Sequence, residues 1–274
     1  MTGTLYLCPT PIGNLEDITL RVIRTLSEVD LIAAEDTRHT LKLLNHLDIK
    51  KPMISYFEHN KIERGEEIIK KLESGLNVAL VTDAGMPAIS DPGEVLVAQC
   101  IERKIKVVPL PGPNAALTAL IASGLSASRF SFQGFLTVNK RARMEHLSIA
   151  SNLPDTLIFY EAPHKLKSTL ADMLKVFGNR KISLCRELTK TFEEFIRTDL
   201  EGAVKLYEEK SPKGEYVLII DGFTEDKTEE FEDISLEELY RSYINEGMDE
   251  KEALKKAAKN KGISKRDAYA ILKT

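Results

Sequence analysis

Three short loops rich in proline and glycine, each placed where a buried strand is expected to end, constrain the fold of this chain most strongly. They are Pro9 to Asn14, Asp83 to Pro87 and Pro109 to Pro113, and each follows an apolar run. In open α/β sheets, ligands bind outside the carboxyl ends of the strands, where glycine lets the backbone approach the ligand and proline fixes the loop's shape. Proline and glycine also occur in ordinary turns. Three such strand ends, with Ser90 to Gly93 following the second, nevertheless predict a single binding site.

The composition is that of a soluble globular protein. The chain has 274 residues, of which 43% are hydrophobic and 29% charged, enough for two compact domains and a small appendage. No stretch approaches the ~18 apolar residues that a membrane span needs, so we expect a cytoplasmic protein without a membrane partner. Three widely spaced cysteines and scattered histidines favour buried thiols and no metal site. The net charge of -4 leaves only local basic patches for binding nucleic acid.

Strand and helix patterns alternate over residues 1–124, which predicts an N-terminal domain built on a parallel α/β sheet. Asp91 and Asn114 are placed to cap two of its helices. The expected strands lie near residues 4–8, 30–35, 77–82 and 105–110, and the expected helices near 17–28, 38–46, 61–74, 92–103 and 113–123.

A second α/β domain is expected over residues 125–223. Its sheet is predicted to be mixed, because the strand at 192–198 follows its predecessor too closely for a helical crossover. Charged residues follow two of its strands directly, which would close a cleft against the first domain. The expected strands are 130–135, 156–161, 181–187, 192–198 and 216–223, with helices near 140–151 and 163–177.

An acidic linker over residues 224–233 precedes a C-terminal domain, 234–274, with short helices at 235–246, 249–261 and 264–273. Lysine and arginine outnumber acidic residues in the last two helices. A solvated helical surface explains this excess, and an RNA-binding appendage resembling a helix-turn-helix is the alternative.

The familiar nucleotide and zinc motifs are absent from the sequence. It contains no G-x-G-x-x-G, no G-x-x-x-x-G-K-[ST] and no H-E-x-x-H, which argues against dinucleotide, nucleoside triphosphate and zinc-protease chemistry.

Two acids and an arginine follow the second expected strand, at the same sheet edge as the three loops. Asp36 or Thr37 could simply cap the next helix. Alternatively, Glu35 and Asp36 could orient or deprotonate a hydroxyl group while Arg38 binds a phosphate.

Seven motifs, in order along essentially the whole chain, carry a resemblance to a known family. They lie at residues 7–14, 33–40, 81–93, 109–113, 134–136, 159–164 and 186–190. In these motifs the chain resembles the ribosomal small subunit methyltransferase I family, a branch of the tetrapyrrole methylase superfamily. Met86 stands where threonine is common and Thr137 where proline is common, which leaves the contact of Met86 with a cofactor open.

The resemblance implies a homodimer of two-domain subunits that transfers a methyl group from S-adenosylmethionine to RNA. The acceptor would be the ribose 2'-hydroxyl of a decoding-centre cytidine in 16S ribosomal RNA, either as naked RNA or in the 30S particle. The rivals are a methyltransferase of the same superfamily acting on a tetrapyrrole or a protein side chain, and a ribosome assembly factor without catalysis. The basic C-terminal helices argue against a small planar substrate.

We expect the cofactor to lie between the two α/β domains, with its carboxylate at the helix start near Asn114 and its cationic end near Asp83. Asp36 or Glu35 would accept the proton of the hydroxyl. The expected cofactor contacts are Pro11, Asp83, Gly85, Met86, Asn114, Ala115, Tyr160, Leu188 and Glu215. The expected phosphate contacts are Arg38, Lys140, Arg141, Arg143, Arg186, Lys190, Lys255, Lys256, Lys259 and Arg266.

Overall fold

The computed structural model describes residues 2–224 and 234–272. The chain divides into two compact units, Met1–Gly222 and Phe223–Thr274. Apart from Thr224, the expected acidic linker lies outside the described residues. Among those described, no helix is both long and apolar enough to cross a membrane.

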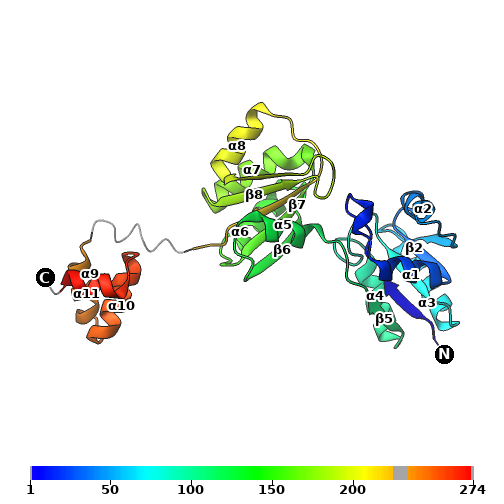
Figure 1. The fold of residues 1–274 in the computed structure, drawn as a ribbon, viewed down its shortest axis with the longest axis horizontal. Coiled ribbons are helices and arrows are strands. Elements are labelled where there is room, and N and C mark those ends of the chain that lie inside the picture. Colours follow the sequence, from blue (N-terminus) through cyan, green and yellow to red (C-terminus); the bar gives the residue numbers. More distant parts are fainter. Residues whose placement is uncertain (1, 225–233, 273–274) are drawn as a thin grey trace. The chain divides into compact units, whose positions relative to one another are not determined.

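A purely parallel five-stranded sheet forms the first half of the larger unit and confirms the predicted architecture (Figure 1). Its order is β3-β2-β4-β1-β5. The central strands β2 and β4 are buried along their whole length, as expected for a parallel sheet covered on both faces. The strands are β1 (Thr4–Leu7), β2 (Leu31–Ala34), β3 (Met53–Ser55), β4 (Val78–Val81) and β5 (Lys106–Pro109).

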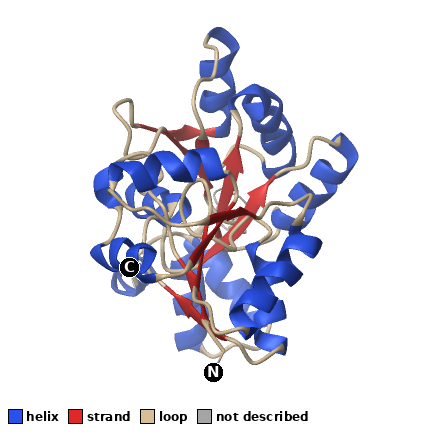
Figure 2. Cartoon of the chain, turned by 90° about the vertical axis from the view of Figure 1, so that its right-hand side faces the viewer, coloured by secondary structure: helices blue, strands red, loops and turns tan. Residues whose placement is uncertain are grey.

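Helices cover both faces of this first sheet. α3 and α4 share one apolar core with it, and α1 and α2 share another. Figure 2 shows strands lying between helices. Pro92, not Asp91, is the N-cap of α4, while the Asp91 carboxylate accepts hydrogen bonds from the backbone N–H groups of Ala88 and Gly93. The helical segments are η1 (Leu15–Asp17), α1 (Leu20–Glu28), α2 (Thr37–His46), α3 (Lys61–Glu73) and α4 (Gly93–Glu102).

The second sheet is mixed, as predicted, with the order β6-β7-β10-β8-β9. Only β6 and β7 pair in parallel; the remaining neighbours are antiparallel. A helix that the sequence analysis did not predict, α8, joins α6 and α7 in the core on one face of this sheet. The elements are β6 (Phe130–Phe135), α6 (Lys140–Ala150), β7 (Thr156–Glu161), α7 (Pro163–Phe177), β8 (Lys181–Arg186), β9 (Glu194–Asp199), α8 (Leu200–Glu209) and β10 (Tyr216–Ile220).

α5 (Ala115–Ser123) covers the other face of the second sheet, although the sequence analysis assigned it to the first domain. Ala119 and Leu120 share a buried core with Ile158 and Ile219. Asn114 caps the helix as predicted, because its side chain accepts from the N–H of Leu117 at 2.9 Å. An apolar helix pattern shows that a face is buried but not which sheet buries it, so the boundary at residue 124 was placed too late for the packing.

The smaller unit holds the three predicted helices around an apolar core of its own. Ser235 and Glu238 form a reciprocal capping box at the first helix, and Asp249 caps the second. The helices are α9 (Leu236–Asn245), α10 (Glu250–Asn260) and α11 (Lys265–Leu272).

Candidate active site

The three proline- and glycine-rich loops meet at the carboxyl ends of β1, β4 and β5. Thr10 and Gly85 exchange backbone hydrogen bonds of 2.9 and 3.0 Å, and the Thr10 hydroxyl donates to the carbonyl of Thr82. A Cβ on Gly112 would lie 2.6 Å from the Cβ of Pro9. Glycine at this position therefore allows the first and third loops to touch, and the three loops form one continuous wall.

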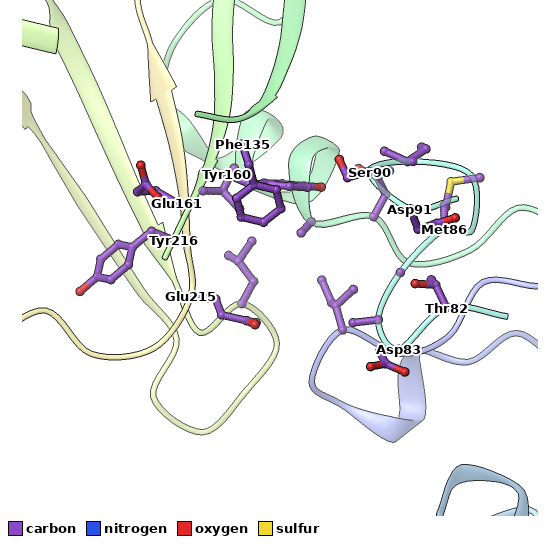
Figure 3. Close-up of a pocket in the computed structure, with 18 of the residues that line it drawn as sticks. Thr82, Asp83, Met86, Ser90, Asp91, Phe135, Tyr160, Glu161, Glu215 and Tyr216 are labelled. Atoms are coloured by element: carbon purple, nitrogen blue, oxygen red, sulfur yellow. The ribbon is translucent and has the colours of Figure 1, made fainter. Parts of the chain in front are cut away.

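A cavity of about 470 Å³ lies between this wall and the second sheet, a size typical of small-molecule sites (Figure 3). Thr82, Asp83 and Met86 stand on one side, and Phe135, Tyr160 and Glu215 on the other. The lining residues are Ile12, Glu35, Thr82, Asp83, Ala84, Gly85, Met86, Ile89, Ser90, Asp91, Asn114, Ala115, Phe135, Tyr160, Glu161, Ala162, Glu187, Leu188, Lys190, Glu215, Tyr216 and Val217.

Among the described residues, four of the six non-glycine residues with a left-handed backbone lie in two loops of the cavity; Asp48 and Lys104 are the other two. Ala88 and Ser90 have φ of 68° and 65°, and Glu187 and Thr189 have φ of 51° and 63°. Residues with a side chain rarely adopt this left-handed conformation, which costs energy and persists where the surrounding structure enforces it. Such outliers cluster at binding sites, so the strain independently points to this cavity as functional.

Glu35 and Asp83 brace the ends of β2 and β4 against each other. One carboxylate oxygen of Glu35, Oε2, accepts from the Thr82 hydroxyl at 2.7 Å and from the Asp83 N–H at 3.3 Å. The Asp83 carboxylate accepts from the N–H of Asp36 at 3.1 Å. Burial, and then the negative charge of Glu35, raise the pKa of Asp83. Both acids line the cavity in positions fixed by hydrogen bonds.

Asp36 has a different role from its neighbour Glu35 and does not line the cavity. Its side chain caps α2 through the N–H of Arg38 and also binds the Arg38 guanidinium at 2.8 Å. The hydrogen bonds from Arg38 lower the pKa of Asp36 to about 2. Asp36 is therefore a helix cap in an exposed ion pair.

Only one of the two carboxylate oxygens of Asp91 is hydrogen-bonded within the described residues. Its Oδ1 accepts from the N–H groups of Ala88 and Gly93 at 2.9 and 2.7 Å. Its other oxygen is buried and has no hydrogen-bond partner in the part of the chain that the structure describes. Burial raises the pKa of this carboxyl group. Because Asp91 lines the cavity, a bound cation or donor could satisfy that oxygen.

An aromatic group forms part of the opposite wall. The Tyr160 ring packs against Phe132 and Phe135 at centroid distances of 5.0 and 5.4 Å. Its hydroxyl accepts a hydrogen bond from the N–H of Ala116 at the start of α5, and burial raises its pKa. The Tyr160 ring is therefore held in a fixed position in the cavity wall, near Phe135 (Figure 3).

The loop after β8 closes the remaining side and touches the first proline-rich loop. The N–H of Asn14 donates to the Thr189 hydroxyl at 3.1 Å, and a Cβ on Gly13 would lie 2.9 Å from the Leu188 carbonyl. Lys190 pairs with Glu187 at 3.2 Å and with Glu215 at 3.7 Å. Burial opposes ionisation of Glu187, but the hydrogen bonds from Lys190 and from the N–H of Glu215 outweigh it and lower the pKa of Glu187.

Eight of the nine residues expected to contact a cofactor line the cavity; Pro11 does not, and its neighbour Ile12 does. The sequence reasoning did not select Ser90, Asp91, Phe135 or Glu161 as cavity residues. Signals for them were present, because all four lie within the seven motifs that carry the family resemblance. Met86, which stands where threonine is common in the family, also lines the cavity.

Arg143 is a correction to the expected phosphate contacts. It lies within α6, and its side chain is only 10% exposed. Its guanidinium binds Asp172 at 2.7 Å and donates to the carbonyls of Thr137 and Val138. These bonds hold the guanidinium against the protein. Arg143 therefore fixes the loop after β6 and does not face an RNA phosphate.

The other expected phosphate contacts differ in their accessibility. The Arg38 side chain is 89% exposed although it pairs with Asp36. Arg186 binds Glu194 at 2.6 Å, and Lys190 lies inside the acidic cavity. Lys140, Arg141, Lys255, Lys256, Lys259 and Arg266 are exposed, and Lys256 also lies over the Tyr243 ring.

The cavity residues fit S-adenosylmethionine, the cofactor that the family resemblance implies. Its two cationic groups suit the acids Asp83, Asp91 and Glu215. Its carboxylate suits the N-terminus of α5, and its adenosine suits apolar and aromatic side chains such as Leu188 and Tyr160. The orphaned oxygen of Asp91 supplies a structural reason to expect a positively charged or donating ligand.

Known protein sequences match this chain over most of its length. The family of Tetrapyrrole (Corrin/Porphyrin) Methylases matches residues 4–204. A Halalkalibacterium halodurans protein named ribosomal RNA small subunit methyltransferase I is 54% identical over 98% of this chain and 94% of its own length. Proteins of the same name from Bacillus subtilis and Synechocystis sp. are 48% and 46% identical, over 97% and 98% of this chain and 93% and 97% of their own lengths.

Solved structures share the fold at low sequence identity. A diphthine synthase has a TM-score of 0.61 at 12% identity, covering 80% of this chain and 90% of that chain. A uroporphyrin-III C-methyltransferase from Thermus thermophilus, complexed with S-adenyl homocysteine, has a TM-score of 0.57 at 16% identity, covering 79% and 97%. These similarities confirm the α/β architecture expected of the chain.

Proposed function

Because the chain belongs to the tetrapyrrole methylase family, and within it to the ribosomal RNA small subunit methyltransferase I family, we propose that it methylates 16S ribosomal RNA. The methyl donor is S-adenosylmethionine, and the acceptor is the ribose 2'-hydroxyl of a decoding-centre cytidine. The observation that carries this proposal is the acidic cavity at the carboxyl ends of parallel strands, in a chain whose relatives of that name match it over nearly its whole length.

The cavity walls would bind the cofactor and exclude water. When bound, S-adenosylmethionine supplies a methyl group activated by an adjacent sulfonium cation. Asp83 and Asp91 would bind cationic groups, while Ile12, Leu188 and Tyr160 would cover apolar parts of the ligand. Methyl transfer needs close alignment of the acceptor oxygen with the methyl group, and a rigid, strained loop provides such positioning.

Glu35 is a better candidate than Asp36 for the proton acceptor. Glu35 lines the cavity and is oriented by Thr82 and Asp83, and its Oε1 accepts no hydrogen bond from the described residues. Asp36 is held in an ion pair, and a pKa of about 2 makes it a weak base. Of the two acids expected from the sequence, the geometry therefore favours the one within the cavity.

Exposed cations would bind RNA phosphates outside the cavity. Acidic side chains greatly outnumber Lys190 in the lining, so a polyanion would be repelled from its interior and only the target nucleotide would enter. Arg38 lies in the first turn of α2 and is exposed, as are the lysines of α10. A homodimer remains part of the proposal, and light scattering of the purified protein tests it.

Methyl transfer from radiolabelled S-adenosylmethionine to unmodified 30S particles is the decisive experiment. Naked 16S RNA, uroporphyrinogen and ribosomal protein serve as alternative acceptors. We expect label in RNA, recovered after nuclease digestion as 2'-O-methylcytidine. Label in a tetrapyrrole or a protein would refute the proposal, as would a protein that binds the cofactor and 30S particles without transfer, which is the behaviour of an assembly factor.

A further inference from the structure

The edge strand β6 carries three exposed phenylalanines, and the last of them lines the cavity. Phe130, Phe132 and Phe135 are 43%, 37% and 56% exposed. We propose that these residues, here called the phenylalanine ladder, are a stacking surface for single-stranded RNA that leads the target nucleotide into the cavity. This inference rests on the proposed function and names the surface by which the RNA next to the target is bound.

A β-bulge places all three rings on one face of the sheet. The pairing of β6 with β7 shifts by one residue between Phe132 and Gly134, and Gly134 adopts a φ of 66°. Without the extra residue, Phe135 would point to the opposite face, because side chains alternate along a strand. The residues of β7 opposite the rings also alternate and share a face. The cross-strand pairs are Phe130 with Thr156, Phe132 with Ile158, and Phe135 with Tyr160.

The ladder is continuous with the cavity and uncovered at the sheet edge. α5 covers the middle of this face, where Ile158 is fully buried, but β6 lies at the edge and its rings stay exposed. Phe135 lines the cavity beside Tyr160 (Figure 3). Alternate residues of a strand are roughly 7 Å apart, about twice the ~3.4 Å between stacked bases, so the backbone spacing of Phe130 and Phe132 suits successive bases that stack on exposed rings.

Cations lie in the sequence at both ends of the ladder. Arg129 precedes the strand, and its side chain is 74% exposed although it pairs with Asp155. Lys140 and Arg141 begin α6 and are exposed, and the described residues offer neither of them an ion pair. Exposed aromatic rings combined with cations that bind the backbone are the features of single-stranded nucleic acid sites. A second copy of this chain would explain the apolar rings but not their continuity with the cavity.

The test compares Phe130→Ala with two controls in the full chain. Neither Phe130 nor Phe132 lines the cavity, but Phe132 packs against the cavity residue Tyr160, so Phe130 is the residue to replace. Phe192→Ala removes a ring that is 74% exposed but lies outside β6, and Phe130→Tyr keeps a ring at the ladder. The affinity for a fluorescent single-stranded pyrimidine RNA is measured by anisotropy, and that for S-adenosylmethionine by calorimetry. We expect Phe130→Ala to weaken RNA binding roughly 5- to 150-fold, with both controls and all cofactor affinities unchanged.

Unchanged RNA affinity in Phe130→Ala overturns the proposal. Sedimentation of the same samples shows whether that variant instead loses a dimer, in which case the rings belong to an interface between copies. A wrong assignment of the methylation reaction can be told apart from a wrong assignment of the RNA-binding surface. If the wild-type chain methylates no RNA but Phe130→Ala still loses RNA affinity, the ladder stands as an RNA-binding surface and the assigned reaction does not.

Discussion

Replacement of Gly85 by valine tests whether the wall of three loops forms the cofactor site. Gly85 has a φ of 83°, and its backbone pairs with Thr10. A Cβ there would lie 3.4 Å from Cγ2 of Ile12 and 3.7 Å from the carbonyl oxygen of Pro113. The Cβ itself would make ordinary contacts, but the two methyl groups of valine extend beyond it and need room that the neighbouring loops occupy. We expect the loops to separate and cofactor binding to weaken.

The size of the effect follows from these contacts. A left-handed backbone costs a residue with a side chain about 1–2 kcal/mol, and the overpacking adds about 1–3 kcal/mol. At roughly 2–4 °C per kcal/mol, we expect the melting temperature to fall by about 4–20 °C. Because Ile12 lines the cavity, the affinity for S-adenosylmethionine should fall at least about tenfold, the equivalent of ~1.4 kcal/mol.

Gly124→Val is the matched control. Gly124 has the same φ of 83°, but its Cβ would meet only Arg197 side-chain atoms, at 3.8 Å or more. It should lose about 2–8 °C of melting temperature through backbone strain alone and keep its cofactor affinity. Calorimetry and thermal unfolding measure both quantities. A folded Gly85→Val protein that binds the cofactor as tightly as Gly124→Val does would refute the reasoning.

Four further outcomes are expected. Glu35→Gln should lower the rate of methyl transfer by roughly 10²–10⁴-fold with unchanged cofactor affinity. Asp36→Asn keeps the helix cap and should keep most of the activity. Equal losses of the two variants in single-turnover assays would contradict this distinction. Because the pKa of Asp83 is raised, its carboxylate gains its proton at a higher pH than an ordinary aspartate, so cofactor affinity should fall on acidification and Asp83→Asn should remove that dependence in pH-resolved calorimetry. Arg143→Leu should destabilise the fold by about 3–5 kcal/mol in denaturant unfolding, because it leaves the Asp172 carboxylate, only 13% exposed, without its partner; RNA affinity should stay the same. Weaker RNA binding without destabilisation would restore Arg143 as a phosphate contact. A chain ending at Asp233, outside the described residues, should keep cofactor binding but lose about one unit of log-log salt slope for each phosphate contact in the removed helices; an unaltered slope would show a solvated surface.

The sequence predicted the part of the site that depends on local chain geometry. Proline, glycine and apolar runs identify strand ends, and parallel strands bring their carboxyl ends to one edge. The convergence of Thr10 with Gly85 and of Pro9 with Gly112 follows from that rule.

Two elements escaped prediction because their local signals are weak. β3 has only three residues, Met53–Ser55, at the edge of its sheet, too few to establish an alternating pattern. α8 follows β9 without an intervening loop and contains Gly202 in its first turn, a residue that disfavours helix. Its start is nevertheless marked by Asp199, whose side chain accepts from the Gly202 N–H.

The roles of the charged residues depended on tertiary partners that are distant in sequence. Asp172 lies 29 positions from Arg143, and no motif indicates that the two pair in the interior. Glu35 and Asp36 are adjacent in sequence, yet only the first faces the cavity. The sequence therefore shows which residues are charged, but not which of them can reach a ligand.

The packing of α5 has a consequence for the modularity of the chain. The helix contributes Ala115 to the cavity at its first residue and buries Leu120 in the core of the second sheet. A fragment ending at Gly124 would carry an apolar helix without its sheet, and the complementary fragment would expose Ile158 and Ile219 to water. A functional exchange of halves between relatives would need its junction before Asn114, so the interchangeable segment is longer than the alternation of strands and helices implies.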